Sequence, residues 1–274
     1  MPAAYTHYRF GKDVEACLPY LYKKSIEKYH ELYDIGLHGP DILFYYHPLS
    51  SNNINQTGYA MHDKPADEFF AKTAAIWKEN WQDEALKAYL YGFICHFSLD
   101  STCHPYVEKM ISISGIDHNE IETELERYLM KKDGIDPVSY IPIQHIHASS
   151  ENSNVIAPCF DTLTPKDILS SLRGMIICHK LLHVSSERKR KILYTGLKIS
   201  GHYHSMQGLV MKEEPDPRTA GYCGLLEKMY TEAITVAVSL IQQYTNVLEH
   251  GASLSPRFGL TFGAGKDWQN LFVA

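Results

Sequence analysis

Five residues within one short stretch constrain this chain more than any other feature of its sequence. The stretch reads GFICHFSLDSTCHPYV and then GIDHNEIE, and the five are His96, Asp100, His104, His118 and Glu122. The first three fall four residues apart, and the last two repeat that spacing. In an α-helix, a step of four residues rotates a side chain by only about 40°, so each set shares one helix face. Imidazole and carboxylate groups are ligands that zinc accepts. The stretch therefore predicts a metal site built on helices.

The surroundings of these residues decide between a metal site and an ordinary surface contact. A single His and Asp at helical spacing is more often a surface pair than a ligand pair. Before His96, apolar residues recur at spacings of three and four: Leu86, Tyr89, Leu90, Phe93, Ile94 and Phe97. This pattern marks a helix face that points to the core. His96 borders this face, and a buried polar group without a partner is costly. Burial and the repeated spacing together favour the metal site.

The composition is typical of a folded protein with no general attraction to nucleic acid. The chain has 274 residues, of which 45% are hydrophobic and 21% are charged, and these are ordinary values for a folded chain. Its formal net charge of −6 gives no overall pull toward nucleic acid or an anionic membrane. Fifteen His residues are the unusual feature. They fit a metal-binding protein.

The sequence predicts a cytoplasmic protein without a transmembrane segment. The opening MPAAYTHYRFGKD lacks the basic region and apolar run of a secretory signal. The longest apolar run, residues 233–241, is interrupted by Thr235 and Ser239 and is far too short to span a bilayer. The six Cys residues occur singly, with no CxxC, which suits reduced thiols.

The rest of the pattern predicts an all-α fold in a single domain over residues 1–274. Helices are expected over residues 19–33, from Asp63 to about Trp81, from Asp83 onward, from His118 to about Lys132, from Thr164 onward, and over residues 224–249. Residues 49–63 and 136–161 are expected to be long loops because they are rich in polar residues or Pro. An α/β alternative lacks the alternating strand signals that it needs.

Local signals place two of the five residues at helix ends. Pro105 disfavours helical geometry in the residue before it, so His104 is expected at a helix end or kink. Asp117 and Glu120 are spaced like a capping box, which places His118 at the first position of the next helix. Four other histidines are expected to lie in connecting segments without a role in the site: His145, His147, His202 and His204.

Several motifs, taken in their order along the chain, resemble the bacterial zinc-dependent phospholipase C family. They are THY with His7, GPD with Asp41, GYAMHD with His62, then HFSLDSTCHPYV and HNEIE. The HxxxD motif followed by HP and then HxxxE is fairly specific. The other motifs are weak individually, and it is their order along the chain that supports the resemblance. The resemblance covers about residues 1–135. It implies an all-helical fold that is shared with the single-strand-specific fungal nucleases.

This resemblance implies a cluster of two or three zinc ions. The ligands of the first ion would be Asp41, His62 and His96, those of the second Asp100, as a bridge, and His7, and those of the third His104, His118 and Glu122. In such proteins the mature first residue also binds the second ion through its amino group and carbonyl. Here that residue would be Met1 or, after removal of Met1, Pro2.

The activity implied by the resemblance is phosphodiester hydrolysis. Clustered divalent ions stabilise the negative charge that this reaction places on oxygen atoms. Asp41 and Asp100 are the expected catalytic residues, with Asp41 orienting or deprotonating the attacking water. The expected substrate is a small phosphodiester or a phospholipid head group, and the sequence carries no strong nucleic-acid signal.

Two other interpretations remain open from the sequence. An HD-type metal phosphohydrolase would use the doublet His62 and Asp63, but it would leave His104, His118 and Glu122 without a role. A non-catalytic protein would use the metal only to brace a helical bundle that binds a partner. Structural zinc sites are usually closed and rich in Cys. The predominance of His and carboxylate therefore favours an open, reactive site.

Overall fold

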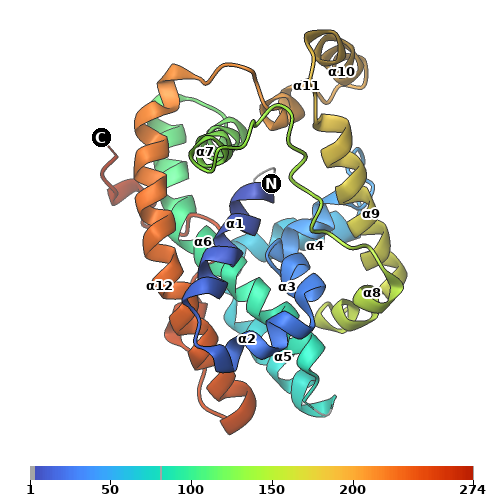
Figure 1. Cartoon of the computed structure of the whole chain (residues 1–274), viewed down its shortest axis with the longest axis vertical. Helices are drawn as coiled ribbons and strands as arrows, with labels where there is room; N and C mark the ends of the chain where they lie inside the picture. The colour runs from blue at the N-terminus through green and yellow to red at the C-terminus, as the bar shows by residue number, and fades with distance from the viewer. Residues whose placement is uncertain (1–3, 81, 274) are drawn as a thin grey trace.

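The computed structural model describes residues 4–80 and 82–273, and Figure 1 shows that helices form the body of the molecule. The α-helices are α1 (Ala4–Cys17), α2 (Tyr20–Lys28), α3 (His30–Gly36), α4 (Asn53–Asp63), α5 (Asp67–Glu79), α6 (Glu84–Ser114), α7 (His118–Lys132), α8 (Ser150–Ile156), α9 (Pro165–Leu182), α10 (Glu187–Ile199), α11 (Tyr203–Met206) and α12 (Ala220–His250). The short 3₁₀ helices are η1 (Gly39–Tyr45), η2 (Ala157–Cys159), η3 (Gln207–Leu209), η4 (Pro217–Thr219), η5 (Pro256–Gly259) and η6 (Trp268–Asn270). Within the described ranges no β-strand forms, only one isolated bridge between Pro65 and Thr261. The predicted all-α fold is confirmed.

The long helix α6 runs through the middle of the molecule and organises the packing around it (Figure 1). It begins after Asp83, whose side chain accepts the N–H of Ala85, and it ends at Gly115 with a left-handed φ of 66°. Most of its residues are buried, as expected for a helix that is apolar on all sides. Its most extensive neighbours are α3 and α12. The metal-ligand candidates of α6 therefore lie in the interior.

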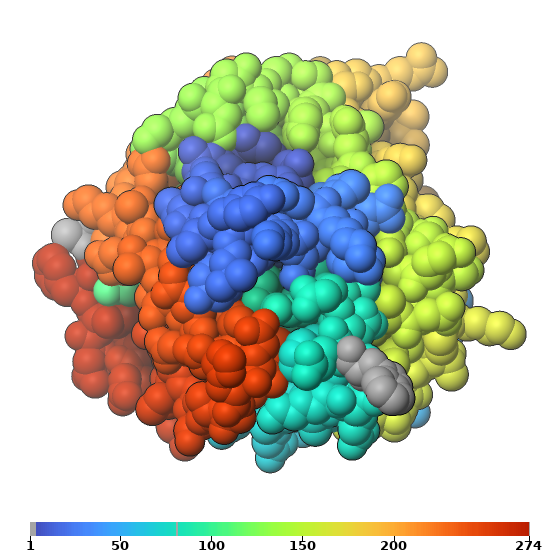
Figure 2. Space-filling model, turned by 60° about the horizontal axis from the view of Figure 1, so that its bottom comes forward, coloured from blue at the N-terminus to red at the C-terminus, as the bar shows by residue number. Residues whose placement is uncertain are grey.

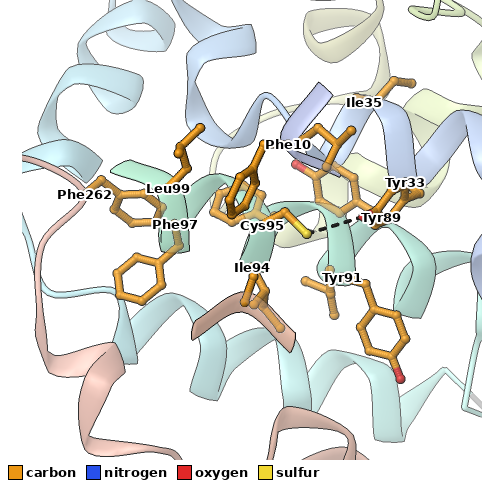
Figure 3. Close-up of a cluster of buried hydrophobic side chains, with 14 of the residues drawn as sticks. Phe10, Tyr33, Ile35, Tyr89, Tyr91, Ile94, Cys95, Phe97, Leu99 and Phe262 are labelled. Carbon is orange, nitrogen blue, oxygen red and sulfur yellow. Dashed lines mark hydrogen bonds between the residues drawn. The ribbon is translucent and has the colours of Figure 1, made fainter. Parts of the chain in front are cut away.

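One continuous cluster of buried apolar side chains surrounds α6. Figure 3 shows part of it, with Phe10 from α1 and Tyr33 from α3 beside the α6 residue Cys95. The Tyr33 hydroxyl donates a hydrogen bond to the carbonyl of Gly11 and lies 3.4 Å from the Cys95 sulfur. The C-terminal Phe262 reaches the same cluster (Figure 3). Helices from both ends of the chain are thus fixed to the central helix.

A close contact between two glycines sets the distance between α3 and α6. Gly36 on α3 faces Gly92 on α6, and a Cβ added at Gly92 would clash with the carbonyl oxygen of Tyr33 and lie 2.9 Å from the Gly36 Cα. A Cβ added at Gly36 would clash in turn with the carbonyl of Tyr89. Both obstacles are backbone atoms of packed helices, so no side chain can move aside.

We expect Gly92→Ala to lower the free energy of unfolding by about 2 kcal/mol or more, because the added methyl group forces two packed helices apart. The matched control is Gly224→Ala in α12, where an added Cβ meets no atom within 4 Å. That control should stabilise the protein by about 0.5 to 1 kcal/mol through helix propensity. Chemical denaturation of both variants measures the difference. Equal stability of the two variants would contradict the close contact.

Residues 53–63 form the helix α4, so the long loop expected there is wrong for most of its length. Asn52 caps this helix: its side chain accepts the N–H groups of Ile54 and Asn55, and the Asn55 side chain accepts the N–H of Asn52. This capping box is built from two Asn residues instead of the usual Ser or Thr with Glu. The expected loop over residues 136–161 is likewise interrupted by α8.

Helix α6 continues through Pro105 to Ser114, so of the helix end or kink expected at His104, the helix end is wrong. A proline inside a helix removes one hydrogen bond and costs about 3 kcal/mol. The turns that follow bury Val107 and Met110 in the core, and this tertiary packing offsets the local cost. His104 is therefore held by a continuous helix.

The helix expected over residues 19–33 is divided at Tyr29, which has an irregular φ of −125°. Ser25 and Ile26 are buried, whereas Leu21 is exposed. The helix expected to reach Trp81 is α5, which ends at Glu79, and Trp81 itself lies outside the described residues.

His118 is the first residue of α7, as predicted, with Asp117 as the N-cap. The expected capping box is wrong, because the Glu120 side chain accepts a hydrogen bond from Lys212 instead. The predicted helix over residues 224–249 is confirmed as α12 and stops at Gly251. None of the described helices combines the length and the apolar character that crossing a bilayer requires.

Candidate metal centre

The eight residues expected as metal ligands converge in space from five elements. They are His7 on α1, Asp41 on η1, His62 on α4, His96, Asp100 and His104 on α6, and His118 and Glu122 on α7. Six of them are buried, and His62 and His118 are partly exposed. Residues separated by more than 100 positions in the chain thus meet in one place.

The carboxylate of Asp100 lies at the centre of this cluster. Its Oδ1 is 3.4 Å from Nε2 of His7, and its Oδ2 is 3.1 Å from Nε2 of His96. The same Oδ2 is 3.8 Å from Nε2 of His62 and 3.8 Å from Nδ1 of His104. Four imidazoles from three helices therefore face a single buried carboxylate.

The GPD segment brings Asp41 beside His62 and His96. Gly39 has a φ of 47°, and a Cβ added there would lie 2.6 Å from Cγ of the His96 ring, so both its backbone and its space require glycine. Pro40 then starts η1, and Asp41 Oδ1 lies 3.0 Å from His62 Nε2 and 3.8 Å from His96 Nε2. His62 Nδ1 lies 2.9 Å from the carbonyl of Gly58 and donates to it, which leaves Nε2 directed at the cluster.

A second carboxylate organises the other end of the cluster. Glu122 Oε1 lies 3.0 Å from Nε2 of His118 and 3.3 Å from Nε2 of His104. The other ring nitrogen of His104, Nδ1, is 2.6 Å from the carbonyl oxygen of Phe262 and donates to it. That bond fixes the His104 ring so that Nε2 faces Glu122.

Three groups of side chains in this cluster have the geometry to hold a metal ion. They are His7 with His96 and Asp100, Asp41 with His62 and His96, and His104 with His118 and Glu122. Within each group the ligand atoms lie within 4.8 Å of one another. Two groups contain the same residues as the ligand sets expected from the sequence. In the third group His96 joins His7 and Asp100, so the residue that two groups share is His96, whereas Asp100, the expected bridge, belongs to one group only. The first residues, Met1 and Pro2, lie outside the described part of the chain.

The donor atoms in these groups fit metal ions better than they fit one another. Nε2 of His62, Nε2 of His96, Oδ2 of Asp100 and Oε2 of Glu122 are buried and make no well-aligned hydrogen bond among the described residues, although two His–Asp pairs lie only 3.0 and 3.1 Å apart. Unpaired buried polar atoms are costly and rare. An ion placed among them would contact these imidazole and carboxylate groups, a mixed nitrogen and oxygen set that zinc accepts.

Burial and the neighbouring charges shift several pKa values of the cluster far from their usual ranges. Burial alone would lower the pKa of His104, but Asp100 and Glu122 outweigh it and raise that pKa to about 10. Burial would raise the pKa of Asp100, but His104 and His96 bring it down to about 2. Burial and the nearby His96 lower the pKa of His7 to about 4. In the metal-free protein at neutral pH, ionised carboxylates thus face a protonated His104 and a neutral His7.

A cleft of about 770 Å³ opens onto one side of the cluster. Three of the ligand candidates line it: His62, His104 and His118. Other lining residues come from η1, α4, α6, α9, the region around α11 and the C-terminal segment, and they include Phe44, Tyr59, Glu108, His202 and Trp268. A small molecule in this cleft would touch the candidate metal centre directly.

Two histidines that sequence analysis placed outside the site lie close to it. His202 lines the cleft, and His145 is partly buried with its Nε2 2.7 Å from Nε2 of His38. The His145 ring also stacks on Tyr8, the residue next to His7. His147 is exposed and lies 3.7 Å from Glu31. Both residues lie in a segment expected to be a loop, and nothing in its sequence indicates that His145 lies near the site and His147 does not.

Glu126 is a buried residue that sequence analysis missed. Its Oε1 accepts the backbone N–H of Tyr5 at 2.6 Å, so α7 holds the first turn of α1, which carries His7. Burial raises the pKa of Glu126 to about 8. A signal existed, because Glu126 follows Glu122 by one helical turn and shares its face.

The fold is all-helical, and its buried histidines and carboxylates form a cluster beside a cleft. These features define a helical protein with a candidate cluster of metal sites. A family model described as zinc dependent phospholipase C matches residues 6–170, which is more than half of the chain and includes all eight ligand candidates. The chain belongs to the zinc dependent phospholipase C family. No curated protein and no solved structure matched in the corresponding searches.

We expect zinc uptake by the metal-free protein to release protons. A histidine must be neutral to coordinate a metal, and the raised pKa of His104, about 10, keeps it protonated at pH 7 without metal. The apparent affinity for zinc should therefore rise with pH between 7 and about 10. Isothermal titration calorimetry at pH 7 in buffers of different ionisation enthalpy measures the protons released. A heat of binding that is equal in all buffers would contradict this assignment.

We expect Glu126 to make the metal-free protein less stable as pH rises from about 4.5 to about 8. In this interval the unfolded chain has lost the proton that the folded state retains, so raising the pH favours unfolding. Glu126→Gln removes the titrating group. The stability of the wild type relative to this variant should therefore fall with pH across the interval, as urea denaturation at several pH values would measure. A constant difference would show that Glu126 is not buried as a neutral acid.

Proposed function

We propose that this protein is a zinc-dependent hydrolase of phosphodiester bonds in phospholipid head groups. The single observation that carries the proposal is the cluster of three ligand groups, two of which share His96 and two of which have residues that line a cleft. Membership of the zinc dependent phospholipase C family supports zinc as the metal and a phospholipid as the substrate class. The eight residues of the cluster are the proposed ligands of two or three ions.

The chemistry of the reaction is divided between the metal and the chain. Zinc ions in such a cluster supply positive charge that stabilises the transition state and lowers the pKa of a bound water toward about 7. Asp100 lies at the centre of the cluster, where one carboxylate oxygen faces His7 and the other faces His62, His96 and His104. Its pKa of about 2 keeps it ionised at neutral pH, as a ligand must be.

Asp41 is the proposed acceptor of the proton from the attacking water. Its pKa is well below the usual range, because nearby positive charge, to which His96 and His62 contribute, outweighs the effect of burial, so it is ionised at neutral pH. It lies in the same group as His62, which lines the cleft. Water attack on phosphorus breaks the bond to the leaving oxygen, and that oxygen gains the proton.

The walls of the cleft suit a phospholipid head group. Phe44 stacks on Tyr59 with ring centroids 4.3 Å apart, and both line the cleft. Trp268 and Glu108 line it as well. Aromatic faces and a carboxylate attract a cationic nitrogen, so we propose a head group that carries one. A volume of about 770 Å³ is enough for a head group and the adjoining glycerol.

The two other interpretations from the sequence have less support. An HD-type site would need Asp63 as a ligand, but Asp63 belongs to none of the three ligand groups among the described residues. A purely structural metal would need no access from solvent. The cleft reaches His62, His104 and His118, and that access favours catalysis.

We expect Asp100→Ala to lose at least one zinc ion per chain and nearly all hydrolysis of a water-soluble phosphodiester, because the central carboxylate is removed. His147→Ala, at an exposed position outside the cluster, is the matched control and should keep both. Plasma mass spectrometry gives the zinc content, and circular dichroism verifies that both variants remain helical. Full zinc and full activity in a folded Asp100→Ala protein would refute the proposal.

A further inference from the structure

A segment beside the cleft has a charge that is opposite to that of the rest of the protein. Residues 165–200, which form α9 and α10, contain eight Lys and Arg and two Asp and Glu. The whole chain has 26 Lys and Arg and 32 Asp and Glu, so the remaining residues have 18 basic and 30 acidic side chains. An acidic protein thus carries one strongly basic segment. Most of this segment is beyond the match to the family model, which ends at residue 170.

Helix α10 projects from the body of the molecule. It has one buried residue, Leu197, and its main contacts are with the short α11. Figure 1 places it at the upper right end, and the gold atoms at the upper right of Figure 2 extend past the neighbouring surface. Its inner side is formed by partly buried residues, among them Leu193 and Tyr194. The rest of the helix faces solvent.

The outer face of α10 combines basic and large apolar residues. Ile192 is 64% exposed and Ile199 is 84% exposed. Arg188 and Lys189 are exposed too, and they precede Ile192 by four and three residues, which places them on the same side of the helix. A face with apolar residues flanked by Lys and Arg is typical of helices that lie on anionic membranes.

Helix α9 extends this chemistry to the rim of the cleft. Ile177 and Leu181 are exposed and lie one turn apart, with Lys180 between them. The next residue after each, Cys178 and Leu182, lines the cleft. Beyond α10, the residues His202, Ser205 and Met206 line it again. The segment therefore leaves the cleft wall at the end of α9 and returns to it at α11.

We propose that α9 and α10 form a docking surface for an anionic phospholipid bilayer, which would present lipid head groups at the mouth of the cleft. This inference rests on the proposed function, since it supplies the route by which that substrate reaches the metal centre. Charge complementarity selects the partner: the segment has an excess of six positive charges, which attracts anionic lipids and opposes pairing with a second copy of itself. The exposed isoleucines would enter the interface between head groups and acyl chains.

The test compares two variants of α10 with a matched control in the zinc-loaded full chain. One variant removes charge, Arg188→Gln with Lys189→Gln and Lys191→Gln, and the other removes apolar surface, Ile192→Ser with Ile199→Ser. The control is Leu21→Ser with Lys23→Gln and Lys24→Gln on α2, where a comparable exposed apolar and basic face lies away from the cleft lining. The probes are phosphatidylcholine vesicles with and without about one third phosphatidylglycerol.

We expect the wild type and the α2 control to cosediment with the anionic vesicles, and each α10 variant to bind about tenfold more weakly or worse. Binding to pure phosphatidylcholine vesicles should be weak for all four proteins. Hydrolysis of a water-soluble phosphodiester should be equal in all four, because none of the substituted residues lines the cleft.

Vesicle binding by the α10 variants that equals that of the wild type would overturn the docking surface. So would tighter binding of the wild type to single-stranded DNA than to the anionic vesicles, because the basic segment would then serve nucleic acid. Binding that depends on α10 in a protein that hydrolyses no phosphodiester would support the docking surface and overturn the proposed hydrolysis. Hydrolysis of the soluble diester without vesicle binding would do the reverse.

Discussion

The buried carboxylate of Asp100 is the interaction on which the rest of the structure depends. Ionised groups in an apolar interior are costly unless opposite charge compensates them. Here the helix that carries Asp100 is surrounded by the main hydrophobic cluster, and the protonated His104 on α6 supplies opposite charge, while His7 on α1 and His62 on α4 face the same carboxylate. Each of these elements must be placed to within about an ångström for the donor atoms to meet. The apolar packing around α6 supplies that placement.

The contacts that hold the histidines in position are mostly made by the backbone. The carbonyl of Gly58 fixes the ring of His62, and the carbonyl of Phe262 fixes that of His104. Phe262 comes from the C-terminal segment, and its ring also contacts His96 with centroids 5.9 Å apart. The last helix and the segment after it thus support a site whose ligands all come from the first half of the chain. This explains how residues beyond the matched region 6–170 contribute to the site.

Short-range spacing predicted the fold class and pointed to five residues that the structure brings into one cluster, whereas His7, Asp41 and His62 were expected there only from the resemblance to the family. Helical periodicity around His96 and the four-residue steps to Asp100 and His104 are visible without any tertiary information. Features that depend on tertiary packing were missed or wrong: α6 continues through Pro105 because the following turns are buried, and the role of Glu126 depends on where α1 begins. The sequence could not predict that two ligand groups share His96, because this depends on the positions of α1 and η1 relative to α6.

The metal-ligand cluster and the proposed membrane-docking surface lie in different parts of the chain, and these parts differ in how strongly they are packed. The ligand cluster is embedded in the core, where a change of one methyl group is felt by several helices, as the contact between Gly36 and Gly92 shows. Helix α10 has a single buried residue, so its outer face contributes little to the stability of the fold. Substitutions on that face can therefore change which surface the protein contacts while the metal centre stays intact. Helix α9 belongs to both the cleft wall and the basic segment. It is therefore the element that would connect a membrane bound at the basic segment with the cleft above the metal centre.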